Sequence, residues 1–151
     1  TIAESKRKDE EWYINTNITY AFDGTKAKGS YGDATAKAHA DTLYTSDDKT
    51  ANNIPTGKDV GDVKTKGLKT ILIQQVKDQA QGLLNETDWY VTRKAEEDTA
   101  IPSSITTHRK AVRAKQAEME TANAADTPAL ETLYTRNDSG VRPLGDLPTL
   151  E

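Results

Sequence analysis

Large apolar side chains are concentrated in one short stretch of this sequence. The 32 positions from Val60 to Val91 hold 12 of the 34 Leu, Ile, Val, Phe, Met, Trp and Tyr residues of the whole chain. Burial of apolar surface is the dominant favourable contribution to folding, so these side chains must supply most of the core. The flanking segments can add to this core, but they hold too few apolar residues to build one of their own.

The composition also limits the size of that core. Leu, Ile, Val and Phe together number 25 of the 151 residues, a fraction below the roughly 20% under which chains are often disordered. The net charge of −4 is small, however, so the high charge that accompanies disorder is missing. We therefore expect a folded chain that neighbouring chains complete, as an oligomer or as part of a multi-chain assembly.

Several classes of protein are excluded by what the sequence lacks. It contains no cysteine, which excludes a disulfide scaffold, a zinc finger and a cysteine nucleophile. It contains no run of about 18 apolar residues, so we expect no role within a membrane. Charges rather than an apolar stretch follow Thr1–Glu4, so we expect no signal peptide.

The densest apolar stretch has the periodicity of a helix from Leu68 to Leu84, ending near Asn85. At 100° per residue its apolar positions fall within one arc, and its polar positions lie opposite. Gly67 and Gly82 weaken this pattern, because glycine disfavours helix interiors. The residues of the apolar arc are Leu68, Leu72, Ile73, Val76, Ala80, Leu83 and Leu84.

A second helix is predicted from Ser103 to Asn123. The preceding Ile101-Pro102 pair is typical of a helix start, and the charged residues 93–98 are expected to form the connection. The apolar stripe of this helix is narrow, which suits antiparallel packing against the first helix. The stripe consists of Ile105, His108, Val112 and Met119, with the aliphatic stem of Lys115.

Shorter elements are predicted around this helical hairpin. We expect Trp89-Tyr90 to fold back onto the first helix as core residues. A third helix is expected from Pro128 to Tyr134, capped by Asp126 or Thr127. The tail, residues 135–151, is rich in Gly and Pro and is expected to be extended, or disordered unless a partner holds it.

The N-terminal part has the pattern of strands. Large side chains alternate from Glu11 to Phe22, the Asp23-Gly24 pair favours a hairpin turn, and a second strand is expected within residues 26–37. An isolated hairpin is marginal in water, so this one needs a helix or another chain to cover it.

Together these patterns predict an α+β fold in three parts. Residues 1–57 form a strand-rich region with a β-hairpin or small antiparallel sheet. Residues 58–135 form an antiparallel helical hairpin, and residues 136–151 form an extended tail.

Residues with catalytic or metal-binding chemistry are few. The two histidines, His39 and His108, stand without metal-ligand spacing, and we expect no metal, no cofactor and no enzymatic activity. A hydrolase acting on the cell envelope, dependent on one of these histidines, stays open as an alternative.

A basic cluster on the second predicted helix could bind phosphate, but the isoelectric point near 5.3 argues against a dedicated nucleic-acid protein. We expect no nucleic-acid partner, and a basic-helix binder stays open as an alternative. Arg and Trp are also enriched at binding hot spots, which gives Trp89 a second interpretation as a partner contact. The basic cluster consists of Arg109, Lys110, Arg113 and Lys115.

Two short motifs resemble a known family. Residues 83–89 read Leu-Leu-Asn-Glu-Thr-Asp-Trp, and residues 108–113 read His-Arg-Lys-Ala-Val-Arg. The first resembles the Leu-Leu-x-x-Thr-Asp-Trp signature of a bacteriophage tail assembly chaperone family. The second is similar to a Tyr-Arg-x-x-Leu/Val-Arg element on that family's next helix, with His108 in place of tyrosine. The likeness spans Val60 to about Met119 and extends to small tail and tail-fibre proteins of marine and cyanobacterial phages.

The resemblance implies docking to other phage tail or fibre proteins rather than catalysis. It suggests a structural component of the tail or tail fibre, assembled in the host bacterial cytoplasm and retained in the virion. The alternative is a transient tail-fibre assembly chaperone that is absent from the mature particle. The expected partner-binding residues are Leu84, Trp89, Arg93, Arg109 and Arg113.

Overall fold

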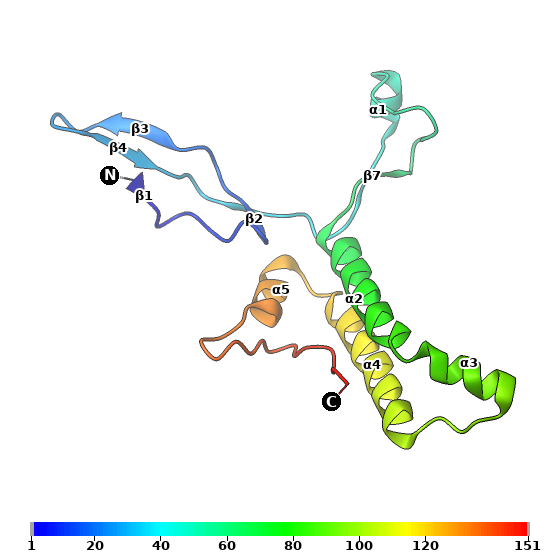
Figure 1. The fold of residues 1–151 in the computed structure, drawn as a ribbon. Coiled ribbons are helices and arrows are strands. Elements are labelled where there is room, and N and C mark those ends of the chain that lie inside the picture. The colour runs from blue at the N-terminus through cyan, green and yellow to red at the C-terminus, as the bar shows by residue number, and fades with distance from the viewer. Residues whose placement is uncertain (1, 151) are drawn as a thin grey trace.

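The computed structural model describes residues 2–150, and for Ile2 it describes the backbone alone. The chain has an α+β fold, as the sequence predicts, and Figure 1 shows two narrow arms and a pair of long helices leading away from a common junction. The elements are β1 (Ile2–Ala3), β2 (Tyr13–Ile14), β3 (Thr19–Phe22), β4 (Ala27–Ser30), β5 (Thr35–Ala36), β6 (Thr42–Leu43), α1 (Ser46–Thr50), β7 (Val63–Thr65), α2 (Leu68–Asn85), α3 (Asp88–Glu97), α4 (Ser103–Ala122) and α5 (Thr127–Tyr134).

Helices α2 and α4 lie side by side in antiparallel directions and carry most of the core (Figure 1). Val76 of α2 packs with Met119 of α4, and Ala80 and Leu84 further along α2 pack with the earlier Val112. All four residues of the narrow stripe on α4 are buried, so both predicted helices and their inner faces are confirmed. Among the described residues, no helix is both long and apolar enough to cross a membrane.

The segment after α2 differs from the prediction. Residues 93–98, expected to form a charged connection, lie mostly in α3. Trp89, expected to fill the core, is 51% exposed on that helix. The apolar pattern misleads here because the chain bends at Thr87 (φ −118°, ψ 5°), so that α3 leads away from the end of α2 instead of folding back along it (Figure 1).

In the C-terminal part α5 agrees with the prediction, and the tail differs from it in one respect. Helix α5 begins after Asp126, whose carboxylate accepts a hydrogen bond from the N–H of Ala129 at 3.1 Å, as expected for a cap. Residues 135–150 form neither helix nor strand. Within them Leu144 is buried against Val76 and Met119, so the chain's own helices hold part of this tail.

The N-terminal arm consists of β1, β3 and β4. The predicted hairpin is present, with β3 antiparallel to β4 and with a turn at residues 23–26, and β1 pairs with β4 in parallel. The expected continuous strand is broken into β2 and β3, and β2 pairs separately with β5. Large side chains on β3 stay exposed, because the rest of the described chain does not cover this arm.

The N-terminal arm meets the helices at a junction built around Trp12, which is 2% exposed. The neighbouring Tyr13 hydroxyl donates a hydrogen bond to a Glu131 carboxylate oxygen of α5 at 2.7 Å. This bond raises the pKa of Tyr13, because losing the phenol proton would leave two anions side by side. The side chains that share this cluster are Trp12, Tyr13, Leu68, Leu72 and Leu130.

The start of α2 is capped by another backbone segment. The N–H groups of Leu68 and Lys69 donate to the carbonyls of residues 38–39 at 3.0 and 3.1 Å, which satisfies two groups that have no partner within the helix. A side chain at Gly67 would place its Cβ 2.3 Å from the carbonyl carbon of Ala40. Gly67 therefore permits this close approach of the backbone. The helical pattern alone indicates only that glycine disfavours the helix at this position.

Residues 41–66 form a second arm. Strands β6 and β7 pair at its base, and α1 begins with a reciprocal capping box between Thr45 and Asp48. Lys64 also pairs with the Asp48 carboxylate, and these contacts lower the pKa of Asp48 from 3.8 to about 2. The β6–β7 pairing joins the predicted regions 1–57 and 58–135.

Candidate functional site

The segments 83–89 and 108–113 meet at the bend between α2 and α3. Thr87 is 1% exposed, and its hydroxyl donates to the carbonyl of Leu84 at 3.0 Å. Arg109 reaches over from α4 and donates through one guanidinium nitrogen to the same carbonyl at 2.8 Å and to the Thr87 hydroxyl oxygen at 2.7 Å. The same nitrogen lies 2.9 Å from a carboxylate oxygen of Asp88. We call these four residues the clasp.

The clasp explains why these residue types occur together. An end of α2 leaves backbone carbonyls without partners inside the helix. The two N–H groups on one guanidinium nitrogen of Arg109 can serve the Leu84 carbonyl and the Thr87 hydroxyl together. Threonine fills a buried position while bridging the carbonyl and the arginine. The aspartate supplies the opposite charge at the first residue of α3, where the helix dipole also favours an anion.

Two of the five expected partner-binding residues therefore act inside this chain. Leu84 is 5% exposed and packs with Ala80 and Val112, so its side chain contributes to the core. The Arg109 side chain is 14% exposed and is engaged in the clasp. Arg113 lies one turn further along α4, is exposed and takes no part in the clasp.

Trp89 and Arg93 do lie together on an exposed helix. The Arg93 guanidinium carbon is 4.7 Å from the centre of the Trp89 ring and 5.6 Å from that of Tyr90, and the two rings are 3.8 Å apart. A cation above an aromatic face is attracted to it. Among residues 2–150 the buried Arg93 Nε has no hydrogen-bond partner. We call Trp89, Tyr90 and Arg93 the α3 patch.

The basic cluster on α4 is largely used for internal contacts. Arg109 belongs to the clasp, and the Lys115 ammonium donates to Glu118 at 2.8 Å and to the carbonyl of Leu144 at 2.5 Å. Lys115 therefore fixes the C-terminal tail onto α4. Only Lys110 and Arg113 are left as exposed cations of the predicted cluster.

The two histidines lie in different surroundings. His39 Nε2 is 2.9 Å from the carbonyl of Asn123, which ties the junction to the end of α4. His108 is 7% exposed on the inner face of α4, and its Nε2 has no hydrogen-bond partner among the described residues. Within residues 2–150 no group of three or more His, Asp or Glu side chains is placed to hold a metal ion.

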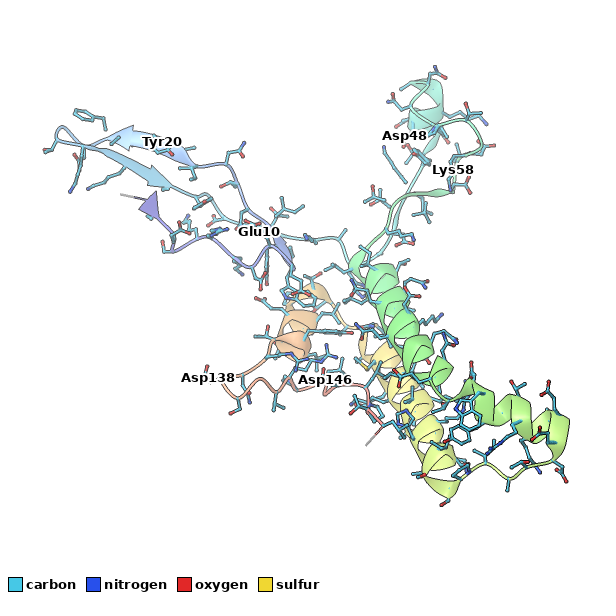
Figure 2. The ribbon with its side chains drawn as sticks, viewed as in Figure 1. Glu10, Tyr20, Asp48, Lys58, Asp138 and Asp146 are labelled. Carbon is cyan, nitrogen blue, oxygen red and sulfur yellow. The ribbon has the colours of Figure 1, made fainter. Side chains whose placement is uncertain are left out.

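A second exposed apolar region lies on the N-terminal arm. Tyr20 and Phe22 are 68% and 72% exposed, more than any other large apolar side chain described. Tyr20 is labelled in Figure 2, where the strands β3 and β4 extend away from the helices. The alternation in the sequence identified these residues, but it did not reveal that the chain leaves them uncovered.

Comparison of the chain with known protein families, with curated proteins and with solved structures finds no match.

Proposed function

We propose that this protein is a non-enzymatic structural component of a bacteriophage tail or tail fibre. In this proposal it docks to other tail or fibre proteins and is retained in the virion. The resemblance of residues 83–89 and 108–113 supports the assignment to phage, and the clasp gives both motifs one shared physical purpose. The arms and the α3 patch supply the docking surfaces.

The observation that carries the docking role is the large accessible surface of the chain. The structure exposes 10171 Å², whereas a compact monomer of 16.6 kDa exposes about 7,600 Å². The excess of about 2,600 Å² is roughly three times the surface that one partner buries in a standard interface. A chain of this shape gains most by burying its arms against neighbouring chains.

The α3 patch has the chemistry of a binding hot spot. Tryptophan, tyrosine and arginine are the residues most enriched at such spots, because each combines a large contact area with a directional polar group. The stacking of Arg93 on Trp89 holds both side chains in place before a partner arrives. Docking at this patch therefore costs little side-chain entropy.

Mass spectrometry of purified virions tests whether the protein is a structural component. The proposal predicts its presence in the mature particle at a fixed ratio to a tail or fibre protein. Absence from the particle, together with a soluble complex containing a fibre protein, would instead support the transient assembly chaperone. Absence from both would overturn the phage assignment.

The role of the α3 patch is tested by supplying tagged variants during phage assembly. Trp89→Ala should reduce incorporation into particles at least tenfold, because loss of a hot-spot residue costs about 2 kcal/mol or more of binding free energy. Lys77→Ala, a change at an exposed position of α2, is the matched control and should incorporate normally. Equal incorporation of the two variants would exclude the patch as a docking surface.

A further inference from the structure

The edge of the N-terminal arm formed by β3 is open. The sheet order is β1-β4-β3, so β3 is hydrogen-bonded to a neighbour on one side. In an antiparallel pair, alternate residues direct both their N–H and their C=O to the partner strand, and the residues between them direct both groups outward. The N–H of Asp23 donates to the carbonyl of Lys26 at 3.2 Å, which makes this a hydrogen-bonded pair. Counting back along β3, Tyr20 and Phe22 therefore direct their backbone groups outward.

This edge lacks the features that usually prevent strand pairing. Residues 15–22 contain no charged residue and no proline, and charges, prolines or bulges are the common protection of an exposed strand. The register of β3 with β4 is regular over all four residue pairs. The Tyr20 ring lies over Gly29 of β4, and its Cε1 is 3.0 Å from where a Cβ on Gly29 would be, so the missing side chain leaves room for the ring.

The opposite edge is different. Strand β1 is two residues long and is followed by Glu4, Lys6 and Arg7, and Lys6 pairs with Asp33 at 2.9 Å. The short length and the charges protect that side in the ordinary way. The contrast between the edges indicates that β3 is kept free for a partner strand.

We propose that β3 pairs antiparallel with β3 of a second copy of this chain, in a register centred on Tyr20. This register sets Tyr20 opposite Tyr20 of the other copy and Phe22 opposite Ile18. Both copies therefore use the same strand surface, as a two-fold axis requires. Tyr20 and Phe22 have the parity that directs backbone groups outward. Ile18, one position before β3, continues the same alternation in the sequence, so each becomes a hydrogen-bonded pair once the dimer forms. The result is one continuous sheet of six strands.

The charges favour a second copy as the occupant. Asp23, which directly follows β3, is the charged residue nearest to the pairing edge in the sequence. The register sets it opposite the neutral Asn17, so no like charges meet across the edge. The Asp23 carboxylate is already neutralised by Lys28 at 2.9 Å. This edge is complementary to an uncharged strand with the same alternation of large side chains. Strand β3 of a second copy has that pattern.

The area sets the expected strength. Tyr20 and Phe22 are about two-thirds exposed in each copy, and large aromatic side chains bury roughly 150–250 Å² each. Even complete burial of these four rings would remove at most about 400–700 Å² of aromatic surface from water across both copies, below the roughly 1,200 Å² at which standard interfaces begin. The dimer should therefore be weak in isolation and visible at high protein concentration. This inference does not depend on the phage assignment.

The absence of cysteine from the chain allows a direct test. Residues in a hydrogen-bonded pair have Cα atoms about 5.5 Å apart, within the range that a disulfide spans. Tyr20→Cys should therefore form a disulfide-linked dimer on mild oxidation. Thr25→Cys at the hairpin tip is the matched control, because its two copies would be about 34 Å apart at 3.4 Å per residue.

A second pair of variants keeps Tyr20 intact and tests the register. A mixture of Ile18→Cys and Phe22→Cys proteins should cross-link at least tenfold faster than either variant alone, because only the mixed pair is directly opposed. The proposal is overturned if Tyr20→Cys cross-links no faster than Thr25→Cys, or if the mixture shows no advantage. It is also overturned if sedimentation detects no dimer of the unchanged protein at high concentration.

Discussion

Replacing Arg109 with methionine tests whether the clasp stabilises the fold. Methionine keeps much of the apolar stem but removes the hydrogen bonds to the Leu84 carbonyl and the Thr87 hydroxyl. Bonds from a charged donor contribute about 1.5–3 kcal/mol each, and bonds from one group are not additive. The Asp88 carboxylate is 51% exposed, so its ion pair adds less than about 1 kcal/mol. We expect the free energy of unfolding to fall by about 3 kcal/mol.

The measurement is thermal and urea unfolding followed by far-UV circular dichroism. For a chain of this size, a loss of about 3 kcal/mol lowers Tm by about 6–12 °C. Arg113→Met makes the same chemical change at an exposed position of α4, and it should alter stability by no more than about 0.5 kcal/mol. Equal effects of the two substitutions would refute the reasoning, because the clasp would then contribute nothing beyond a generic arginine.

Two further predictions concern backbone packing and pH. Gly67→Ala should destabilise the protein by more than about 3 kcal/mol, because the new Cβ would overlap the Ala40 carbonyl. Gly82→Ala, which has nothing within 4 Å of the new Cβ, should stabilise α2 by about 0.5–1 kcal/mol. Urea unfolding measures both changes in the free energy of unfolding, and changes of the same sign would contradict the packing argument. The pKa of Asp48 is lowered from 3.8 to about 2, so its contribution to the second arm is complete above pH 3.8 and is lost as pH falls towards 2. NMR should therefore show the Thr45 amide losing protection over that interval, and Asp48→Asn should remove this dependence; an unchanged amide would exclude the cap.

The helices that form the core could be predicted because the apolar residues of their inner faces recur with the helical period. Leu72 and Val76 on α2 and Val112 on α4 are buried as their spacing indicates. The start of α5 could also be predicted from the sequence, because Asp126 is a strong capping residue. In these elements the local preference and the tertiary packing agree.

The remaining features depend on contacts between distant parts of the sequence. Arg109 looks like one cation of a basic helix until α4 sets it beside Thr87, 22 positions earlier. Trp89 has the apolar character of a core residue, and the bend before it decides that it is exposed. The second arm has few apolar residues and depends on side-chain to backbone bonds such as those of Asp48, which periodicity does not register.

Helix α2 is held at both ends, by the backbone of residues 38–39 at its start and by Arg109 at its end. Its 18 residues make a stiff spacer about 27 Å long between the N-terminal arm and the α3 patch. A partner that engaged both would bind the second site at high effective concentration, so two individually weak contacts would combine into strong avidity. A flexible connection of the same length would lose much of that gain, because it would leave the separation of the two sites unfixed.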